Sequence, residues 1–424
     1  MPTLSPLPHA PQSSPGQDWL EALLEAFPGP LAAAAAADPL RAGRAGARQA
    51  LAASGLPSRK QESWRFTDLS ALTTLAPRPL APAGDARPAA ARTVRLNLEE
   101  ARASQSWPAG VEPLEGSELA GVLGGVLAET GTADDWAVRL NTAIAPEVVA
   151  LRIRGAVNPC LELVSQAGPR AGVLPLRVLL LLEEGATLTL LQVHQAAGAS
   201  LTSVVVEAVL GGDSRLDHGL VARGGDASAL LALTAVRQAP GSQYTQASLC
   251  SGWGLARQEP VILQSGGQAT TRLWGLHWLE GRQISDTHSR VRFAGPEGTL
   301  DQLHKVVAAG ESRSVFNGCV QVPREAQRTA AAQLSRSLLL SDRARIDTKP
   351  ELEIVADDVR CTHGATISRL RDEQLFYLRS RGIGAEQASR LLLRGFCEEV
   401  SAELPDAAGD WTPLSFLHSD VRRP

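Results

Sequence analysis

Two residues near the carboxyl end of the chain, Cys361 and His363, have side-chain types and a spacing that suit iron chemistry. They follow a segment in which apolar and polar residues alternate; if it is a strand that continues, both side chains project from the same face. Sulfur and imidazole nitrogen are ligands for iron or for one edge of an iron–sulfur cluster. Two ligands cannot complete a four-coordinate site, so another molecule must supply the rest. The alternative interpretation is a buried cysteine beside a surface histidine.

The other histidines and cysteines show no comparable pairing. We expect His288 and His304 to be ordinary core or surface histidines. The remaining cysteines, which we expect to be small core residues, are Cys160, Cys250, Cys319 and Cys397. An odd number of widely spaced cysteines without C-x-x-C argues against a disulfide framework and a zinc ribbon, and favours a reducing, cytoplasmic compartment.

Motifs for nucleotide binding and hydrolysis are missing. A phosphate-binding loop needs lysine followed by serine or threonine, whereas Lys60, Lys305 and Lys349 precede Gln, Val and Pro. The sequence contains no His-Glu pair of a zinc protease, no G-x-S-x-G and no G-x-G-x-x-G. We therefore expect no nucleotide to be bound by this chain.

Composition places the chain among globular proteins. Its 424 residues carry a net charge of -4, with 44% hydrophobic and 20% charged residues. This balance gives no electrostatic reason to expect nucleic acid or an anionic membrane surface as a partner. Purely aliphatic runs are far shorter than the ~18 residues that a membrane span needs. We expect residues 1–17, rich in Pro and Ser, to be a disordered tail.

Helices are expected at both ends of the chain. Residues 18–76 form the N-terminal helical region, beginning with a helix over residues 18–26 whose N-cap is Asp18. Residues 77–150 are interpreted as a linker and a transition into the core, because Pro, Ala and Gly are dense in residues 77–88. Residues 367–424 form a C-terminal helical region with helices over 371–381 and 384–404, which we expect to pair with the N-terminal helices.

Residues 151–366 are predicted to be β structure. Short runs rich in Val, Leu, Ile and Thr recur there, broken by Gly, Asp, Asn or Pro every ten or so residues, at 178–182, 186–193, 201–209, 228–236, 261–263 and 268–273. A sandwich, a barrel and a parallel β-helix all fit this spacing. Hairpin signals are scarce, with one Asn-Gly at Asn317 and no Asp-Gly, which favours a stack of parallel coils.

One long segment carries a family resemblance. The sequence K-P-E-L-E-I-V-A-D-D-V-R-C-T-H-G-A-T at 349–366, followed by D-E-Q-L-F-Y-L-R-S-R-G-I at 372–383, resembles the SufB/SufD family of iron–sulfur cluster assembly proteins, and SufD most closely. Shorter supporting segments are S-R-K-Q-E-S-W-R-F-T-D-L at 58–69, L-H-K-V-V at 303–307, V-F-N-G at 315–318 and A-Q-R-T-A at 326–330.

The resemblance implies a fold and partners. The fold is mainly β, a right-handed parallel β-helix core flanked by helical N- and C-terminal regions. The partners are SufB, which docks at the end of the β-helix, and the ATPase SufC, which binds the C-terminal helices. In this family the complex builds nascent clusters with ATP hydrolysed by SufC, so this chain is expected to be a non-catalytic scaffold. The matching histidine lies at the SufB interface, which makes His363, with Cys361, the candidate for a transient cluster or iron.

The sequence also offers candidate docking surfaces for both partners and two alternative functions. The candidate ATPase-docking residues are Phe376, Tyr377 and Ile383, because aromatic anchors dominate many interfaces. Residues 330–358 are expected to pair with SufB, with weaker self-association of the isolated chain. Two other functions remain open, a SufB-type paralogue and a β-helix carbohydrate-active enzyme, for which the candidate carboxylates are Asp213, Asp217 and Asp226.

Overall fold

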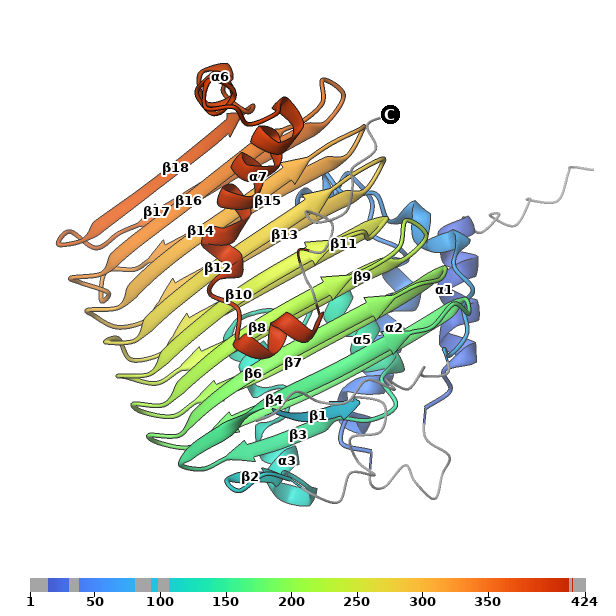
Figure 1. Cartoon of the computed structure of the whole chain (residues 1–424). Coiled ribbons are helices and arrows are strands. Elements are labelled where there is room, and N and C mark those ends of the chain that lie inside the picture. The colour runs from blue at the N-terminus through green and yellow to red at the C-terminus, as the bar shows by residue number, and fades with distance from the viewer. Residues whose placement is uncertain (1–13, 30–37, 81–92, 98–106, 412–413, 415–424) are drawn as a thin grey trace, which may run out of the picture.

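Two facing sheets of parallel strands form the body of the protein. The computed structural model describes residues 14–29, 38–80, 93–97, 107–411 and 414. Over these residues the chain winds as a parallel β-helix of about eight turns, flanked by helices from both ends of the sequence (Figure 1). The predicted fold class is therefore confirmed.

Successive strands alternate between the two sheets. In spatial order, sheet 1 comprises β1 (Thr93–Asn97), β4 (Ala156–Ala167), β6 (Thr187–Ala196), β8 (Arg215–Arg223), β10 (Gln243–Ser251), β12 (Thr270–Leu279), β14 (Thr299–Ala308), β16 (Ala330–Leu339) and β18 (Arg360–Ser368). Sheet 2 comprises β2 (Val111–Pro113), β3 (Val149–Ile153), β5 (Gly172–Leu182), β7 (Ser200–Leu210), β9 (Ala229–Gln238), β11 (Leu255–Gln264), β13 (Ile284–Phe293), β15 (Arg313–Val322) and β17 (Arg345–Ile354).

Only one of the described strand pairings is antiparallel, that of β2 with β3. In most of the others, each strand pairs in parallel with the strand one coil further along the chain, as β5 does with β7, whereas the parallel pair of β1 with β4 joins strands separated by a longer stretch of chain. Asn317 and Gly318, the single Asn-Gly pair, lie inside β15 and make no hairpin. The scarcity of hairpin signals thus pointed to the correct topology.

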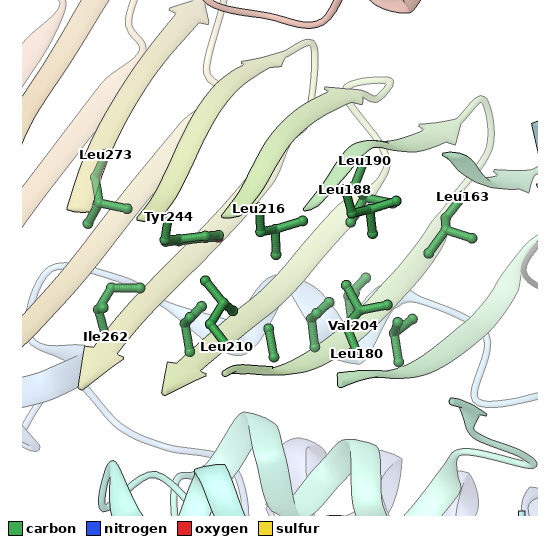
Figure 2. Close-up of a cluster of buried hydrophobic side chains, with 14 of the residues drawn as sticks. Leu163, Leu180, Leu188, Leu190, Val204, Leu210, Leu216, Tyr244, Ile262 and Leu273 are labelled. Atoms are coloured by element: carbon green, nitrogen blue, oxygen red, sulfur yellow. The ribbon is translucent and has the colours of Figure 1, made fainter. Parts of the chain in front are cut away.

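The main core fills the space between the sheets. Every second residue of a strand faces this space, so Leu180 and Val204 of sheet 2 meet Leu188 and Leu216 of sheet 1 (Figure 2). Many strands carry apolar residues on both faces, because helices cover parts of the outer faces of the sheets as well.

N-terminal elements cover sheet 2. They are α1 (Pro15–Ala26), α2 (Arg41–Ser54), the 3-10 helices η2 (Glu62–Trp64) and η3 (Leu69–Thr74), α3 (Gly116–Val122), α4 (Gly125–Glu129) and α5 (Trp136–Ile144). The expected N-cap Asp18 is wrong. Ser14 caps α1 by accepting from Gln17 N at 3.3 Å, and Pro15 suits the first helical position.

Four of the predicted segments fall partly outside the described residues. The undescribed residues are 1–13 of the expected tail, 30–37 of the N-terminal helical region, 81–92 and 98–106 of the expected linker and transition, and 412–413 and 415–424 of the C-terminal helical region. The described part of 77–150 contains α3, α4 and α5.

Two C-terminal elements, α7 (Ala385–Ser401) and the 3-10 helix η4 (Asp406–Trp411), cover the opposite sheet. Between β18 and α7 lies α6 (Asp372–Ser380), none of whose residues is buried. Cys397, Val400 and Trp411 pack on the outer face of sheet 1, where α7 lies across the strands (Figure 1). The predicted pairing with the N-terminal helices is wrong, because each helical region covers the apolar outer face of a different sheet.

Candidate functional site

The last coil of the β-helix is the least covered part of the strand stack. β17 and β18 each end a sheet, with a neighbour on one side only. Their residues are partly or fully exposed, whereas every residue of β7 is buried. Ile354, Val355 and Ile367 are large apolar side chains at this end, with exposures of 39%, 55% and 44%. Unpaired strand edges and exposed apolar groups are features of a surface that binds another chain.

Cys361 and His363 both lie on β18, at this open end. In register with β16, Cys361 stands beside Ala331 and His363 beside Gln333. Ala331 belongs to the interior core, and Cys361 packs against that core. The two side chains therefore share the interior face of the strand, as their i, i+2 spacing predicted.

The two residues differ in accessibility. His363 is exposed, whereas Cys361 is half-buried. Burial raises the pKa of the Cys361 thiol, so the thiol stays protonated at neutral pH unless a metal or a cation lowers its pKa. Among the described residues, no three His, Cys, Asp or Glu side chains lie close enough together to hold a metal ion. An iron bound here would thus need ligands from another molecule.

The interior behind His363 is polar. Gln333 Nε2 donates to Gln302 Oε1 at 2.9 Å, and Gln302 Nε2 donates to Ser289 Oγ at 2.7 Å. Gln333 is only 2% exposed, yet its Oε1 has no hydrogen-bond partner in the described part of the chain. This file of amides runs towards His363, and sequence reasoning missed it. A spacing of 31 residues between Gln302 and Gln333, about one coil, was the available signal.

The ATPase-docking candidates lie on and after α6. Phe376 and Tyr377 are exposed by 71% and 58%, and no residue of α6 is buried. The Arg381 guanidinium lies 5.4 Å from the centre of the Tyr377 ring. Ile383, in the connection to α7, is half-buried. The aromatic pair and Cys361 with His363 are therefore two separate features, one on a projecting helix and one on the last strand.

His304 is an interior histidine. It stacks on Phe316 with ring centroids 4.4 Å apart, and its ring lies 4.9 Å from that of His277. Burial lowers the pKa of His277 to about 4 and holds the pKa of His304 well below its usual value. Both rings are therefore neutral at physiological pH, as core histidines.

His288 lies on the outer face of sheet 2, with Nε2 2.9 Å from Asp286 Oδ1. Asp286 also accepts from Arg257 Nη1 at 2.6 Å and from the Thr67 hydroxyl. Arg257 lies over the ring of Trp64, at 4.0 Å from its centre. The N-terminal motif at 58–69 therefore has a structural role, because it ties η2 and the following segment to β11 and β13.

The other cysteines follow expectation in part. Cys250 and Cys397 are buried, whereas Cys160 and Cys319 are only half-buried. All five cysteines are free. No helix in the described residues is long and apolar enough to cross a membrane.

The carboxylates named for a carbohydrate-active enzyme have local partners or turn geometry. Asp217 accepts from Arg215 at 2.9 Å, and Asp226 accepts from Gln283 at 2.7 Å. Asp213 has a φ of 54°, the left-handed conformation of a turn residue. Turn and strand-end chemistry accounts for all three.

Comparisons with known proteins agree with this geometry. A family model described as SUF system FeS cluster assembly, SufBD core domain, matches residues 164–396. An iron–sulfur cluster assembly SufBD family protein of Synechocystis is 31% identical over 404 residues, which cover 86% of this chain and 87% of that protein.

Two further relatives match different shares of the chain. The iron–sulfur cluster assembly protein SufD of Escherichia coli is 28% identical over 383 residues, 84% of this chain and 88% of that protein. The chloroplastic protein ABCI7 of Arabidopsis thaliana is 39% identical over 234 residues, 54% of this chain and 49% of that protein. The chain therefore belongs to the SufB/SufD family of iron–sulfur cluster assembly proteins and is close to its SufD members.

Proposed function

We propose that this chain is the SufD-type scaffold subunit of a cytoplasmic complex with SufB and the ATPase SufC, in which nascent iron–sulfur clusters are assembled. The observation that carries the proposal is the uncovered last coil, which presents Cys361 and His363 on one face beside unpaired strand edges. In this role the chain is non-catalytic and binds no nucleotide, and SufC supplies ATP hydrolysis.

SufB covers the open end of the β-helix. Its contact with β17 and β18 shields the exposed side chains of Ile354, Val355 and Ile367 and removes two unpaired strand edges. Without SufB, the isolated chain is expected to self-associate through the same surface, more weakly than it binds SufB.

SufC binds α6. Phe376 and Tyr377 support this assignment, because burying large exposed aromatic side chains at an interface is energetically favourable. Deleting residues 371–424 is a poor test, since the loss of α7 and η4 would uncover the apolar outer face of sheet 1. Phe376→Ala with Tyr377→Ala leaves that packing intact and should abolish SufC binding; undiminished binding would refute this docking site.

The cluster is the cargo of the complex, and His363 contributes more to holding it than Cys361. The neutral imidazole ring is the form of histidine that binds metal ions, whereas the Cys361 thiol must first lose a proton that burial stabilises. In the anaerobically purified complex, His363→Ala should lower the iron and sulfide content while assembly and ATPase activity persist. Cys361→Ala should have a milder effect, and wild-type iron content in His363→Ala would remove the ligand assignment.

Anaerobic co-expression with SufB and SufC from the same source tests the proposal directly. Purification on a tag carried by this chain should recover all three proteins, and recovery of this chain alone contradicts the proposal. Val355→Glu should then release SufB, because a charge would be buried in the interface. Leu391→Glu makes the same kind of change at an exposed site on α7 and should leave SufB bound.

The runner-up is a SufB-type paralogue. Co-expression separates the two alternatives, because a SufB-type chain would assemble with SufC and a SufD partner without needing SufB.

A further inference from the structure

A buried amide stands directly behind the candidate iron ligand. Gln333 on β16 is the in-register neighbour of His363 on β18, and side chains at such positions in adjacent strands stand roughly 5 Å apart. On its other side, Gln333 neighbours Gln302 of β14. Three consecutive coils thus align two glutamines and one histidine in a single file.

The hydrogen bonds orient the Gln333 amide. Its Nε2 donates to Gln302 Oε1, whose own Nε2 donates to Ser289 Oγ. The bond to Gln302 uses the amide nitrogen, which leaves the oxygen, on the other branch of the planar amide, free to accept from a donor on the β18 side. Gly318 of β15 leaves room for this arrangement, since a Cβ there would come within 2.4 Å of Gln333 Nε2.

The Gln333 oxygen lacks a partner. It is buried, with no donor among the described residues, and leaving a buried acceptor unsatisfied lowers stability. On the β18 side of its file the neighbouring side chain is His363, whose imidazole carries a ring N–H when neutral. A hydrogen bond from that ring would satisfy the oxygen.

We infer that Gln333 is a positioning residue for His363: its Oε1 accepts from Nδ1–H and leaves Nε2 free to face iron at the open end. Nδ1 is the ring nitrogen closer to the strand and hence to the neighbouring side chain, whereas Nε2 reaches furthest outward. Histidines that bind metal ions commonly donate their other N–H to an oxygen acceptor, which fixes the tautomer and the ring orientation. This inference rests on the proposed ligand role of His363.

Tautomer measurement on the iron-free chain tests the hydrogen bond. With ¹⁵N-labelled histidine at pH 8, long-range ¹H–¹⁵N correlation should show His363, assigned from the signal lost in His363→Ala, with its proton on Nδ1. Gln333→Met, close in volume but without the amide, should convert His363 into a mixture of tautomers. Gln302→Met should shift His363 partly, because the Gln333 amide loses the acceptor that orients it.

A matched control is Gln246→Met, the same change at another interior position of sheet 1. It should leave the His363 signals unchanged. Identical ¹⁵N chemical shifts of His363 in the wild type, Gln333→Met and Gln302→Met would overturn the inference. A wild-type His363 with its proton on Nε2 would overturn it as well.

Iron binding by the complex tests the consequence. Gln333→Met should lower the iron affinity about tenfold, the low end of the range for lost support of a ligand. A changed tautomer with unchanged iron affinity would refute the positioning role. If His363→Ala itself leaves iron binding intact, the ligand proposal fails instead, while the tautomer result still reports on the Gln333 bond.

Discussion

The first and last coils of the β-helix fill the same interior space with different chemistry. Early coils hold mainly leucine and valine, such as Leu180, Leu188 and Val206, none more than 2% exposed, and their buried Gln192 and His194 hydrogen-bond to each other. Late coils place Gln302, His304, Gln333, Ser335 and Ser337 in the interior of sheet 1.

Late coils also hold several buried polar atoms without a hydrogen-bond partner. In the described residues from 304 to 348, the buried atoms without hydrogen bonds are His304 Nε2, Ser312 Oγ, Ser314 Oγ, Gln333 Oε1, Ser337 Oγ and Thr348 Oγ1. Each costs stability in the isolated chain. The difference teaches that the early coils supply stability, whereas the late coils retain polar groups beside the surface that we assign to SufB.

Breaking the ion pair beneath the N-terminal helices should have the largest effect on stability. Arg177 Nη2 lies 2.6 Å from Glu207 Oε1, and both side chains are almost completely buried. Arg177→Met leaves a buried carboxylate without its cation, which costs about 3–5 kcal/mol. Urea unfolding followed by circular dichroism should show this loss. Arg177→Met with Glu207→Leu should recover part of it; a double variant no more stable than the single one would contradict the pairing argument.

Truncating an early interior leucine should have the next largest effect. Leu180→Ala removes a fully buried side chain and should cost about 2–5 kcal/mol. Leu352, on β17, is only partly buried, so Leu352→Ala is the matched control and should cost clearly less. Equal shifts of the unfolding midpoint would mean that the last coil is as firmly packed as the early ones.

Much of this contrast could be predicted from the sequence. The runs at 178–182 and 201–209 matched β5 and β7, and acidic residues in the first turn placed α6 within one residue. Register could not be predicted, because it depends on the length of every coil between two strands. The neighbourhood of Gln333 and His363 was therefore missed, although the shared face of Cys361 and His363 followed from their spacing alone.

Helix placement shows a second limit of the sequence. A helix pattern reveals an apolar stripe but not which of two apolar sheets it covers, so α7 was assigned to the wrong partner. The short helices α3, α4 and α5 lie in the segment that we predicted to be a linker and a transition, and α3 and α4 contain the helix-weakening residue Gly. Tertiary contacts, rather than helix propensity, hold such short helices.

Acid should weaken the protein through its interior histidines. Burial lowers the pKa of His194 to about 3 and those of His218 and His277 to about 4, below the unfolded value of ~6.5. The unfolded chain therefore binds more protons below pH ~6.5, so their contribution is complete above that pH and is lost as pH falls towards 4.

Below the unfolded pKa, the free energy of unfolding should fall by about 1.4 kcal/mol per pH unit for each histidine that stays neutral in the folded chain. Urea unfolding at pH 7 and pH 5 should show it. His277→Gln should reduce this slope by the contribution of one proton. An unaltered slope in His277→Gln would mean that this ring is protonated in the folded state.

The smallest effect is expected from an ion pair on the last coil. Lys349 Nζ lies 2.7 Å from Glu351 Oε1, and the two side chains are 49% and 38% exposed. Exposed pairs contribute about 0–1 kcal/mol because water and salt screen them, so Glu351→Gln should leave the unfolding midpoint of the isolated chain almost unchanged. Set against Arg177→Met, this near-zero result measures how differently the two regions use charge. A loss above about 2 kcal/mol would show that the last coil is already packed without a partner, and the division between a stabilising early region and a receptive late one would fail.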